Sequence, residues 1–477
     1  MTPAGGAARG RRSPLPSPAS SWSSVILHRP DRPVSSGGAA CHNRHREHRP
    51  ARPRSRHRNG RVPGRSRTLL GLRRPPKIGS MSVLTRARPR PLVLLLLAAY
   101  VVLLLSSLGG EMTREIRAPQ ATDFISFFTG ARLVQTDPSC LYCEHAQRAV
   151  QLQAAGPIGH NFFNAFVNLP LAGWVLSPLT RLSLNQATLV FDIASLFALL
   201  GATVLLSRRL PASWPRWLRA AMLTATAGLL CTADAIAQWD TFMLLALAGT
   251  LVALEAEADL AAGLLLAACV VKPQLVWLVV PALMVIGRWR VVGGAALGGA
   301  VWLVSGVVLV GPAQMVEWVR LALHTDVGQT SAQVGPAGLA ALAAGNGAGI
   351  VFSVAAVIAL LVLGWRFRDA LRRDPVAAVA IAIAASLAST PHLWIHDLLL
   401  LAVPLAVWGV RRPGAALAAA GAVDFLYLAD MVSANTLIHL EALVVVAVLA
   451  GLGQSVISGQ RRPRSQMATL EAVTARR

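Results

Sequence analysis

The chain has 477 residues, of which 54% are hydrophobic and only 14% are charged, and its mean hydropathy is +0.53. About a quarter of the residues of a soluble protein are charged, so this composition excludes a soluble globular domain and indicates a polytopic membrane protein. A chain of this length has room for about a dozen membrane-spanning helices. The net charge of +23 is uneven, because residues 1–80 contain 18 Lys and Arg residues but only two acidic ones.

Residues 1–80 are rich in Arg, Pro, Ser and Gly and lack apolar periodicity, so we expect a disordered basic segment. A nucleic-acid or anionic-lipid tail and a targeting peptide are the alternatives, but we expect no nucleic-acid partner. We favour a start at Met81, because three Arg residues and then an apolar run follow it, as in a bacterial inner-membrane protein. The expected organisation is therefore the segment 1–80, a membrane domain over 81–457 and a basic cytoplasmic tail over 458–477.

Apolar segments recur along the membrane domain and predict an all-α integral membrane bundle of about 12 transmembrane helices. Several of these segments are short and interrupted by Pro or polar residues, which membranes tolerate only where protein or a polar cavity satisfies the backbone. We also expect outer-face loops over 110–163 and 312–347 that carry short helices. The apolar segments are 91–109, 164–180, 185–206, 216–237, 240–257, 259–271, 273–287, 291–311, 348–365, 376–391, 396–410, 414–431 and 436–457.

Arginine clusters predict the orientation, because cytoplasmic loops are enriched in Lys and Arg. All of them fall on one side if segment 164–180 dips into the membrane without crossing it, which also places both termini in the cytoplasm. If that segment crosses, the cluster at 208–219 faces outward and later clusters need further adjustment. The clusters are Arg86/Arg88/Arg90, Arg208/Arg209/Arg216/Arg219, Arg288/Arg290, Arg366/Arg368/Arg372/Arg373, Arg411/Arg412 and Arg461/Arg462/Arg464.

In the dipping topology the remaining polar features gather on the opposite face, which suggests one polar cavity on the outer side. They are Asp123 with its loop, Gln238-Trp239-Asp240, Lys272-Pro273-Gln274, the loop 312–347, and the stretch from Pro391 to Asp397. Charges at the membrane edge are costly and usually functional. The simpler explanation is that each feature caps or anchors its own helix, as an Asp such as Asp123 does at a helix start.

The five cysteines give no complete metal signature. Cys140 and Cys143 have the spacing of zinc ligands, but the sequence has no second pair of cysteines to complete a zinc site. We expect either a local disulfide or two ordinary thiols there. Cys231 and Cys269 lie in apolar runs, where we expect small core residues.

A series of short motifs over residues 91–410 resembles glycosyltransferase family 87, within the integral-membrane GT-C superfamily. Two positions depart from the family pattern: Ala237 precedes Gln238 where Gly is common, and Asn168-Leu169-Pro170 replaces a frequent Tyr-x-Pro-Pro run. The motifs are Asp123-Phe124, Gly130-Ala131-Arg132-Leu133, Leu141-Tyr142, Asn168-Leu169-Pro170, Leu176-Ser177-Pro178-Leu179, Ala237-Gln238-Trp239-Asp240, Gly263, Lys272-Pro273-Gln274, Gly287-Arg288-Trp289-Arg290, Ser389-Thr390-Pro391 and His396-Asp397-Leu398.

The resemblance implies a GT-C-like bundle that moves one sugar from a polyprenyl-phosphate donor to a lipid or glycan acceptor. Relatives include mannosyltransferases, so mannose is the expected hexose, and many members need no metal. We expect no metal ion and no cofactor. The partners are then the donor, the acceptor and membrane lipids, and the site faces the periplasm or exterior of a bacterial inner membrane.

Such a reaction needs a base for the acceptor hydroxyl and cationic or N–H donors for the departing phosphate. The resemblance assigns the base to an acidic residue of the first outer loop, here Asp123. Lys272 is the leading candidate for the phosphate contact, although a lysine in this place also snorkels to lipid headgroups. Arg132 either reaches the phosphate or pairs with a lipid headgroup.

The remaining candidate residues are expected to bind the substrate. His392 and His396 are four positions apart and can share a helix face; a hydrogen bond from one of them to phosphate or sugar is favoured over a metal site. Asp397 either orients His396 or binds sugar hydroxyls, and Gln238 and Asp240 are expected sugar contacts.

A transporter or a flippase of lipid-linked sugars is the main alternative, because broken helices and membrane charges are common in transporters. The two halves of the chain show no internal repeat, and the polar residues cluster on one face instead of at the membrane centre. Both observations favour the transferase.

Overall fold

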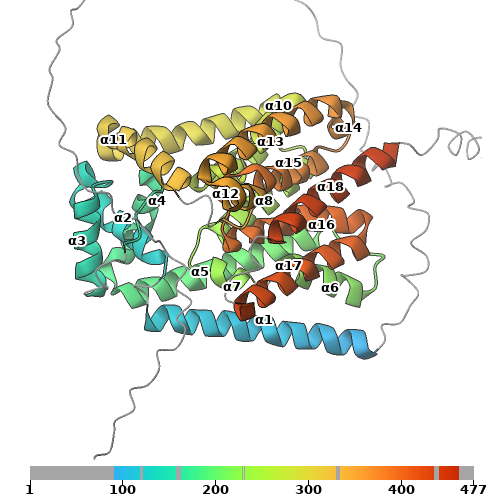
Figure 1. Ribbon diagram of the computed structural model, residues 1–477, viewed down its shortest axis with the longest axis horizontal. Helices are drawn as coiled ribbons and strands as arrows, with labels where there is room; N and C mark the ends of the chain where they lie inside the picture. The colour runs from blue at the N-terminus through green and yellow to red at the C-terminus, as the bar shows by residue number, and fades with distance from the viewer. Residues whose placement is uncertain are drawn as a thin grey trace, which may run out of the picture. The chain divides into compact units, whose positions relative to one another are not determined.

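The computed structural model describes residues 91–118, 122–156, 163–227, 229, 231–328, 333–433 and 440–460. Every regular element within these residues is an α-helix or a 3-10 helix (Figure 1), which confirms the all-helical class. The basic segment 1–80 and nearly all of the tail 458–477 lie outside the described residues, so both remain predictions.

The helices follow one another with short connections. In the first half they are α1 (Pro91–Arg117), α2 (Phe124–Thr136), η2 (Pro138–Cys140), α3 (Glu144–Ala155), α4 (Pro170–Leu176), η3 (Ser177–Arg181), α5 (Leu184–Ser207), α6 (Arg216–Ala227), α7 (Thr232–Ala235) and α8 (Asp240–Glu255). In the second half they are α9 (Asp259–Ala267), η4 (Ala268–Val271), η5 (Pro273–Leu275), α10 (Val279–Val285), α11 (Trp289–Gly328), α12 (Pro336–Ala344), α13 (Asn346–Arg366), α14 (Arg368–Arg372), α15 (Pro375–Ser389), η7 (Ile395–Leu401), α16 (Ala402–Arg411), α17 (Pro413–Ser433) and α18 (Glu441–Gln460).

Five of the described helices are long and apolar enough to cross a membrane: α1, α5, α11, α13 and α18. Three shorter apolar stretches accompany them, namely Asp259–Val271, Pro375–Ser389 and Pro413–Ala429. These helices support a membrane protein, whereas the expected number of 12 spans remains a prediction.

The helical elements of the segment expected to dip into the membrane, 164–180, are the seven-residue helix α4 and the first four residues of η3. A helix of that length rises about 10 Å, roughly a third of the hydrocarbon core, so α4 alone is too short to cross. Most of the expected loop 312–347 is helical, because α11 continues past a kink at Gly311 and Pro312, and α12 follows.

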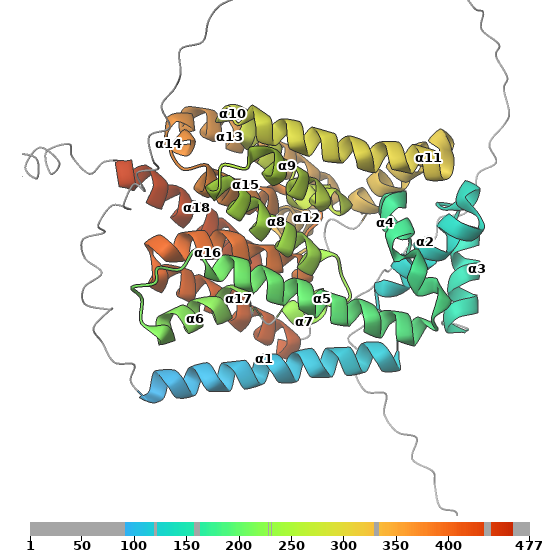
Figure 2. The same ribbon diagram turned by 180° about the vertical axis from the view of Figure 1, so that it is seen from behind.

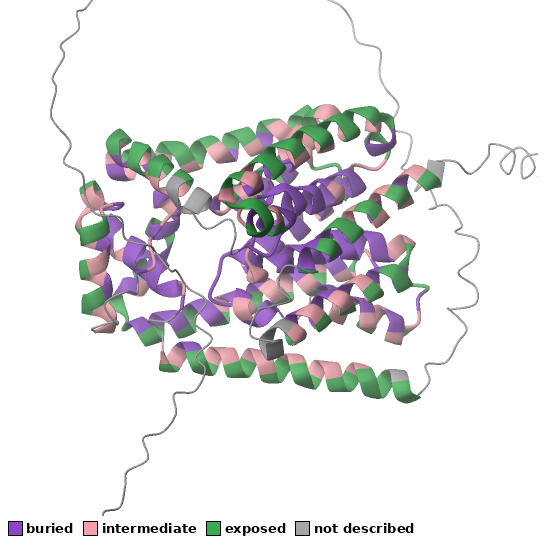
Figure 3. Cartoon of the chain, viewed as in Figure 1, coloured by how far each residue is buried: buried purple, intermediate pink, exposed green. Residues whose placement is uncertain are grey.

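Burial separates an inner group of helices from an outer one (Figure 3). Helices α15 and α16 are buried along most of their length, while every residue of α1 whose burial is described is exposed or half-buried except Glu115. A helix that is apolar on all sides belongs in a protein interior or a bilayer. The buried helices therefore form the centre on which the polar stretch before α16 rests.

Glycines set two close helix contacts. A Cβ on Gly294 of α11 would lie 2.4 Å from the Leu260 carbonyl oxygen of α9, and one on Gly263 would lie 2.1 Å from the Val291 carbonyl oxygen. Figure 2 shows α9 beside α11. Gly173 of α4 approaches Gly130 of α2 in the same way. Small residues allow such backbone approaches between membrane helices.

We expect Gly294→Ala to lower stability, because the added methyl group meets backbone and cannot be accommodated by a side-chain rotation. Overpacking of this kind costs about 1–3 kcal/mol. Gly293→Ala is the matched control, since no atom lies within 4 Å of its added Cβ and both changes improve helix propensity equally, by about 1 kcal/mol. Thermal unfolding in detergent measures the difference, and equal melting temperatures for the two variants would contradict the α9–α11 contact.

Candidate active site

Asp123 precedes α2 at the N-cap position, but its side chain does not cap the helix. Oδ1 accepts a hydrogen bond of 2.6 Å from Asn164 Nδ2, and Oδ2 accepts one from Gln238 Nε2. Both partners come from distant parts of the chain. The carboxylate is therefore held by side-chain amides at a junction of three segments, and the capping alternative does not describe it.

Asn164 is oriented by α3, which lies beside α2. Gln151 of α3 accepts from the Asn164 backbone N–H and donates to its carbonyl oxygen. One turn earlier, Gln147 makes the same pair of bonds with the backbone of Phe166. The two glutamines thus hold the non-helical stretch that places Asn164 beside Asp123.

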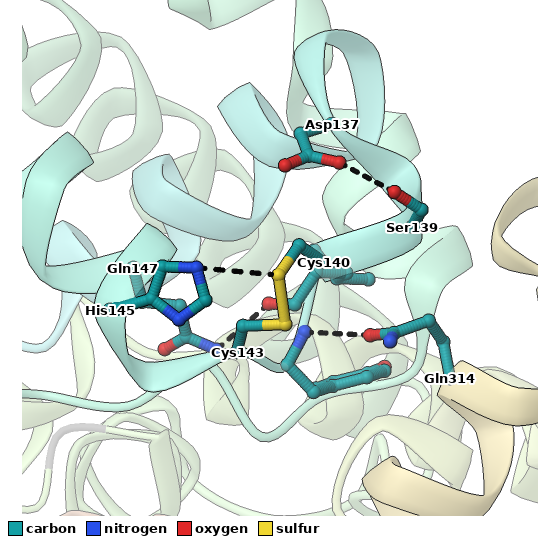
Figure 4. Close-up of a disulfide and its surroundings, with 9 residues drawn as sticks. Asp137, Ser139, Cys140, Cys143, His145, Gln147 and Gln314 are labelled. Atoms are coloured by element: carbon teal, nitrogen blue, oxygen red, sulfur yellow. Dashed lines mark hydrogen bonds between the residues drawn. A yellow bond between two sulfur atoms is a disulfide. The ribbon is translucent and has the colours of Figure 1, made fainter.

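A disulfide joins Cys140 to Cys143 at the turn between η2 and α3 (Figure 4), so the local-disulfide alternative is correct. The loop that it closes is tied to α11 by a bond of 3.0 Å from the Tyr142 N–H to Gln314 Oε1. The Tyr142 ring stacks on Phe166, and its hydroxyl donates to the Asn168 carbonyl. This bridged turn therefore supports the stretch that carries Asn164. The other two described cysteines, Cys231 and Cys269, are free and buried, as expected.

Lys272 lies between two buried carboxylates. Its Nζ atom is 2.8 Å from Asp240 Oδ2 and 2.8 Å from Asp397 Oδ1. Asp240 begins α8, Lys272 separates η4 from η5, and Asp397 lies in η7. Asp397 Oδ2 also accepts from the Trp394 backbone N–H at 2.7 Å. The ammonium group thus joins three segments that meet away from regular α-helix interiors.

The two histidines occupy different positions in this group. His396 Nε2 lies 3.6 Å from Asp397 Oδ1. His392 Nε2 accepts a hydrogen bond of 3.1 Å from Trp394 Nε1. The backbone between them is not α-helical, because η7 begins only at Ile395. The expectation of a shared α-helical face is therefore wrong.

The Asp123 group and the Lys272 group are neighbours, because Gln238 and Asp240 flank Trp239. The Trp239 ring is buried and packs against Phe127, Phe191 and Phe242. It is a core residue in this structure, not part of an interfacial aromatic belt. The segment Gln238-Trp239-Asp240 holds Asp123 with its first residue and Lys272 with its last.

Burial raises the pKa of the Asp123 carboxyl group above its usual value, although the Asn164 hydrogen bond and the positive charge of Lys272 act in the opposite direction. For Lys272, burial alone lowers the pKa, but the attraction of Asp240 and Asp397 outweighs burial and raises it. Lys272 therefore remains protonated beside a carboxyl group that takes up protons more readily than an exposed aspartate.

Two groups of described side chains have metal-ligand chemistry. Cys140, Cys143 and His145 form one, but the disulfide removes its thiolates. Asp240, His396 and Asp397 form the other, with ligand atoms within 4.8 Å of one another. The Lys272 ammonium already bridges the two carboxylates of this second group, so it supplies the positive charge that a metal ion would bring.

Two cavities include predicted site residues or their sequence neighbours in their lining. One of about 150 Å³ is lined by Val175, Trp239, Phe242, Met243, Ala268, Val271 and Trp302, all of them apolar or aromatic. Two of its lining residues are next in sequence to residues of the site, because Trp239 lies between Gln238 and Asp240 and Val271 precedes Lys272. The other, of about 230 Å³, includes Arg132 among its lining residues.

Arg132 does not join the other predicted site residues. It lies nine positions after Asp123, about two and a half helical turns at 3.6 residues per turn, and thus on the opposite face of α2. Its Nη1 atom donates a hydrogen bond of 3.4 Å to the Thr180 carbonyl oxygen. The expected contact of Arg132 with the reacting phosphate is therefore not supported by its position.

The profile of glycosyltransferase family 87 matches residues 166–395, just under half of the chain. Residues 166–395 belong to glycosyltransferase family 87. The chain is a membrane glycosyltransferase, as the resemblance implied. No curated protein and no solved structure matches it.

The family 87 region contains Gln238, Asp240, Lys272 and His392, whereas Asp123, Arg132, His396 and Asp397 lie outside it. The structure brings Asp123 to Gln238, and His396 and Asp397 to Lys272. The site is thus assembled from the family 87 region and from residues on both sides of it.

Asn164 was missed by the sequence reasoning, although it lies 2.6 Å from the Asp123 carboxylate. It stands at the start of an apolar segment, directly after Phe162 and Phe163. Nothing in that pattern distinguishes a residue of the site from an ordinary loop asparagine. Only the pairing of its backbone with Gln151 brings it to Asp123.

We expect Lys272→Met to be strongly destabilising, because it leaves Asp240 and Asp397 buried at 0% and 1% exposure without a cation. Removal of one partner of a buried ion pair typically costs about 3–5 kcal/mol. Arg320→Met is the control, since Arg320 and Glu317 form an exposed pair worth at most about 1 kcal/mol. Thermal unfolding measures both variants, and addition of Asp240→Asn should restore part of the loss. Equal stability of the two single variants would contradict the buried ion pairs.

Proposed function

We propose that this glycosyltransferase moves one hexose, in the first instance mannose, from a polyprenyl-phosphate donor to a lipid or glycan acceptor at the outer face. Asp123 is the general base. The observation that carries the proposal is the Asp123 carboxylate, which is held by Asn164 and Gln238 instead of capping α2. A carboxylate held in this way, within the electrostatic influence of the half-buried Lys272, is arranged for chemistry and adds little to the helix.

In this reaction the acceptor hydroxyl attacks the anomeric carbon of the donor sugar, and the bond from that carbon to the phosphate oxygen breaks. Asp123 takes the hydroxyl proton, and polyprenyl phosphate leaves with the bonding electrons. A positioned base contributes roughly 10²–10⁴-fold to such a step. The raised pKa of Asp123 makes its carboxylate a stronger proton acceptor than that of an exposed aspartate.

Lys272 contacts the departing phosphate. An ammonium group has three N–H donors, and Asp240 and Asp397 take two of them. The third is available to a phosphate oxygen, and the lysine side chain is 14% exposed. The two carboxylates offset much of the lysine charge, so a hydrogen bond from His392 or His396 to the phosphate or the sugar completes the donor contacts.

Asp240 and Gln238 bind sugar hydroxyl groups, and Asp397 orients His396 and Lys272. Asp240 Oδ1 is buried and has no hydrogen-bond partner among the described residues, while Oδ2 receives Lys272. Buried acceptors are normally satisfied, and a hydroxyl group of the substrate would satisfy this one. The Gln238 amide donates to Asp123, which leaves its oxygen as an acceptor for the same sugar.

The apolar cavity of about 150 Å³ beside Trp239 and Val271 receives the first part of the polyprenyl chain. Its lining is apolar, and Val175 at its edge is 53% exposed, so the cavity meets the surface that faces lipid. A phosphate at Lys272 would place the attached lipid beside this cavity. This juxtaposition favours a lipid-linked donor over a soluble sugar nucleotide.

Two observations favour a location of the proposed site at the outer face: the basic residues at the start of α11, and the disulfide near the other end of that helix. Arg288 and Arg290 stand at the start of α11, and basic residues mark the cytoplasmic end of a span. Gln314, beyond the kink, contacts the turn closed by Cys140 and Cys143. Disulfides persist in oxidising compartments, so the bridged turn and the neighbouring Asp123 are expected outside the cytoplasm.

A transporter or flippase was the competing function class. The family 87 match favours a transferase, and no separate observation in the described residues favours transport. The two classes differ in a simple way, because a transporter moves its substrate unchanged while a transferase consumes the lipid-linked sugar.

We expect purified wild-type protein in lipid to move label from polyprenyl-phosphate mannose to a product in a membrane lipid extract. Asp123→Asn should lower the rate by about 10²-fold or more, because it keeps the shape and removes the base. Asp137→Asn is the control, since the Asp137 carboxylate lies away from the site and accepts a hydrogen bond from Ser139 in the turn that follows α2. Full activity of Asp123→Asn would remove the base assignment, and failure with mannose, glucose and arabinose donors would contradict the donor class.

The rate should fall on the acid side as Asp123 becomes protonated. The Asn164 hydrogen bond stabilises the charged carboxylate and so lowers its pKa. Asn164→Ala should therefore raise the pKa and move the acid limb of the pH–rate profile to higher pH. Asn185→Ala is a matched control, because Asn185 bonds to the Ile116 carbonyl and not to the site. An unchanged acid limb in Asn164→Ala would contradict the link between Asn164 and the base.

A further inference from the structure

The cavity that contains Arg132 is separate from the proposed active site. It has a volume of about 230 Å³ and lies between α2, α3 and the start of α5. Phe128 and Arg132 line it from α2, Gln153 and Ala154 from α3, and Leu182 and Ser183 from the turn before α5. Because Arg132 and Asp123 lie on opposite faces of α2, this cavity calls for an explanation of its own.

The guanidinium group of Arg132 keeps most of its binding capacity. A guanidinium has five N–H donors, and the described contacts of Arg132 use one, in a long bond of 3.4 Å to the Thr180 carbonyl. No carboxylate among the described residues lies within ion-pair distance of it. No acidic residue lines the cavity either. The cavity therefore offers a fixed positive charge with unused donors.

The start of α5 adds to the positive electrostatic potential in the cavity. Ser183 caps the 24-residue helix α5, and its capping box with Gln186 is complete. The N-terminal end of a helix carries a partial positive charge, here at the same cavity as Arg132. Gln153 adds a neutral side chain that both donates and accepts hydrogen bonds. All polar groups that line the cavity are therefore compatible with an anion.

The rest of the lining is apolar, and the cavity lies at the start of a membrane helix. Leu184, which also lines it, is the first residue of the span Leu184–Ser207. Leu182 is 37% exposed at the rim, and Leu152 on α3 is 53% exposed. Exposed leucines at the end of a span are expected where side chains meet lipid. A ligand that fits must be anionic at one end and apolar at the other.

We propose that this cavity binds the phosphate headgroup of an anionic membrane phospholipid, with Arg132 as the main phosphate contact. The glycerol and the first methylene groups lie against Phe128 and Leu182, and the acyl chains run along α5. A zwitterionic lipid fits less well, because no carboxylate lines the cavity to receive its ammonium group. This site does not depend on the proposed sugar transfer.

The test uses the full chain, purified in a mild detergent and titrated calorimetrically with short-chain phosphatidylglycerol. Parallel titrations use phosphatidylcholine of equal chain length and inorganic phosphate. The variants are Arg132→Gln, which removes the charge, and Ala154→Phe, which keeps Arg132 and fills the cavity. Arg181→Gln is the control, because Arg181 is an exposed arginine of η3 next to Thr180 and does not line the cavity. Circular dichroism and melting temperature check that each variant is folded.

We expect saturable binding of phosphatidylglycerol to wild type and to Arg181→Gln. Binding should be weaker by about tenfold or more in Arg132→Gln, as for loss of a charge-assisted hydrogen bond, and similarly weak in Ala154→Phe. The proposal fails if Arg132→Gln or Ala154→Phe binds like wild type, or if phosphatidylcholine binds equally well. Equal Arg132-dependent binding of inorganic phosphate would assign the cavity to a soluble anion and overturn the lipid.

Discussion

The two ion pairs of Lys272 are the contacts on which the centre of this structure depends. They join residues 32 and 125 positions apart in the chain, at the start of α8, between η4 and η5, and in η7. Two of these places are irregular backbone inside an apolar bundle, which is tolerated where protein groups or a polar cavity satisfy the freed backbone bonds. Buried ion pairs rarely add stability over apolar packing, but loss of one partner is costly. The lysine therefore selects one arrangement of three segments more than it strengthens the bundle.

Asp123 lies next to this centre but is held in place by a different part of the structure. Its partners are Gln238, which belongs to the α8 side, and Asn164, which the glutamines of α3 hold in place. The α2–α3 unit has its own restraints, namely the disulfide turn, the contact of Tyr142 with Gln314, and the close approach of Gly130 to Gly173. The proposed base and the proposed phosphate contact thus rest on different substructures that meet at Trp239. A displacement of the α2–α3 unit would move the proposed base without breaking the ion pairs of Lys272.

The sequence predicted the helical membrane class and most helix positions, because long apolar runs and Pro breaks act locally. It also predicted Asp123, Lys272, Asp240 and Asp397 as one polar group, since charges in an apolar context are rarely accidental. It did not predict how they pair. A single lysine between two apolar segments indicates a buried cation but does not identify the two carboxylates that bind it. Asn164 was missed because its role depends on tertiary contacts with Gln151. Arg132 was predicted near the phosphate because it lies close to Asp123 in the sequence. Helical periodicity instead places it on the opposite face of α2.

The same periodicity places the two proposed sites on opposite faces of α2. One end and face carry Asp123 toward the buried amides and the lysine, and the opposite face carries Arg132 toward α3 and the first turn of the α5 span. A helix of 13 residues is about 20 Å long at 1.5 Å per residue, which separates these two sites by much of its length. A lipid headgroup held at Arg132 would restrain α2 from the membrane side, while Asn164 and Gln238 restrain it from the protein side. The position of the proposed base would then depend on the bilayer as well as on the fold, which would suit an enzyme that uses the proposed lipid-linked donor.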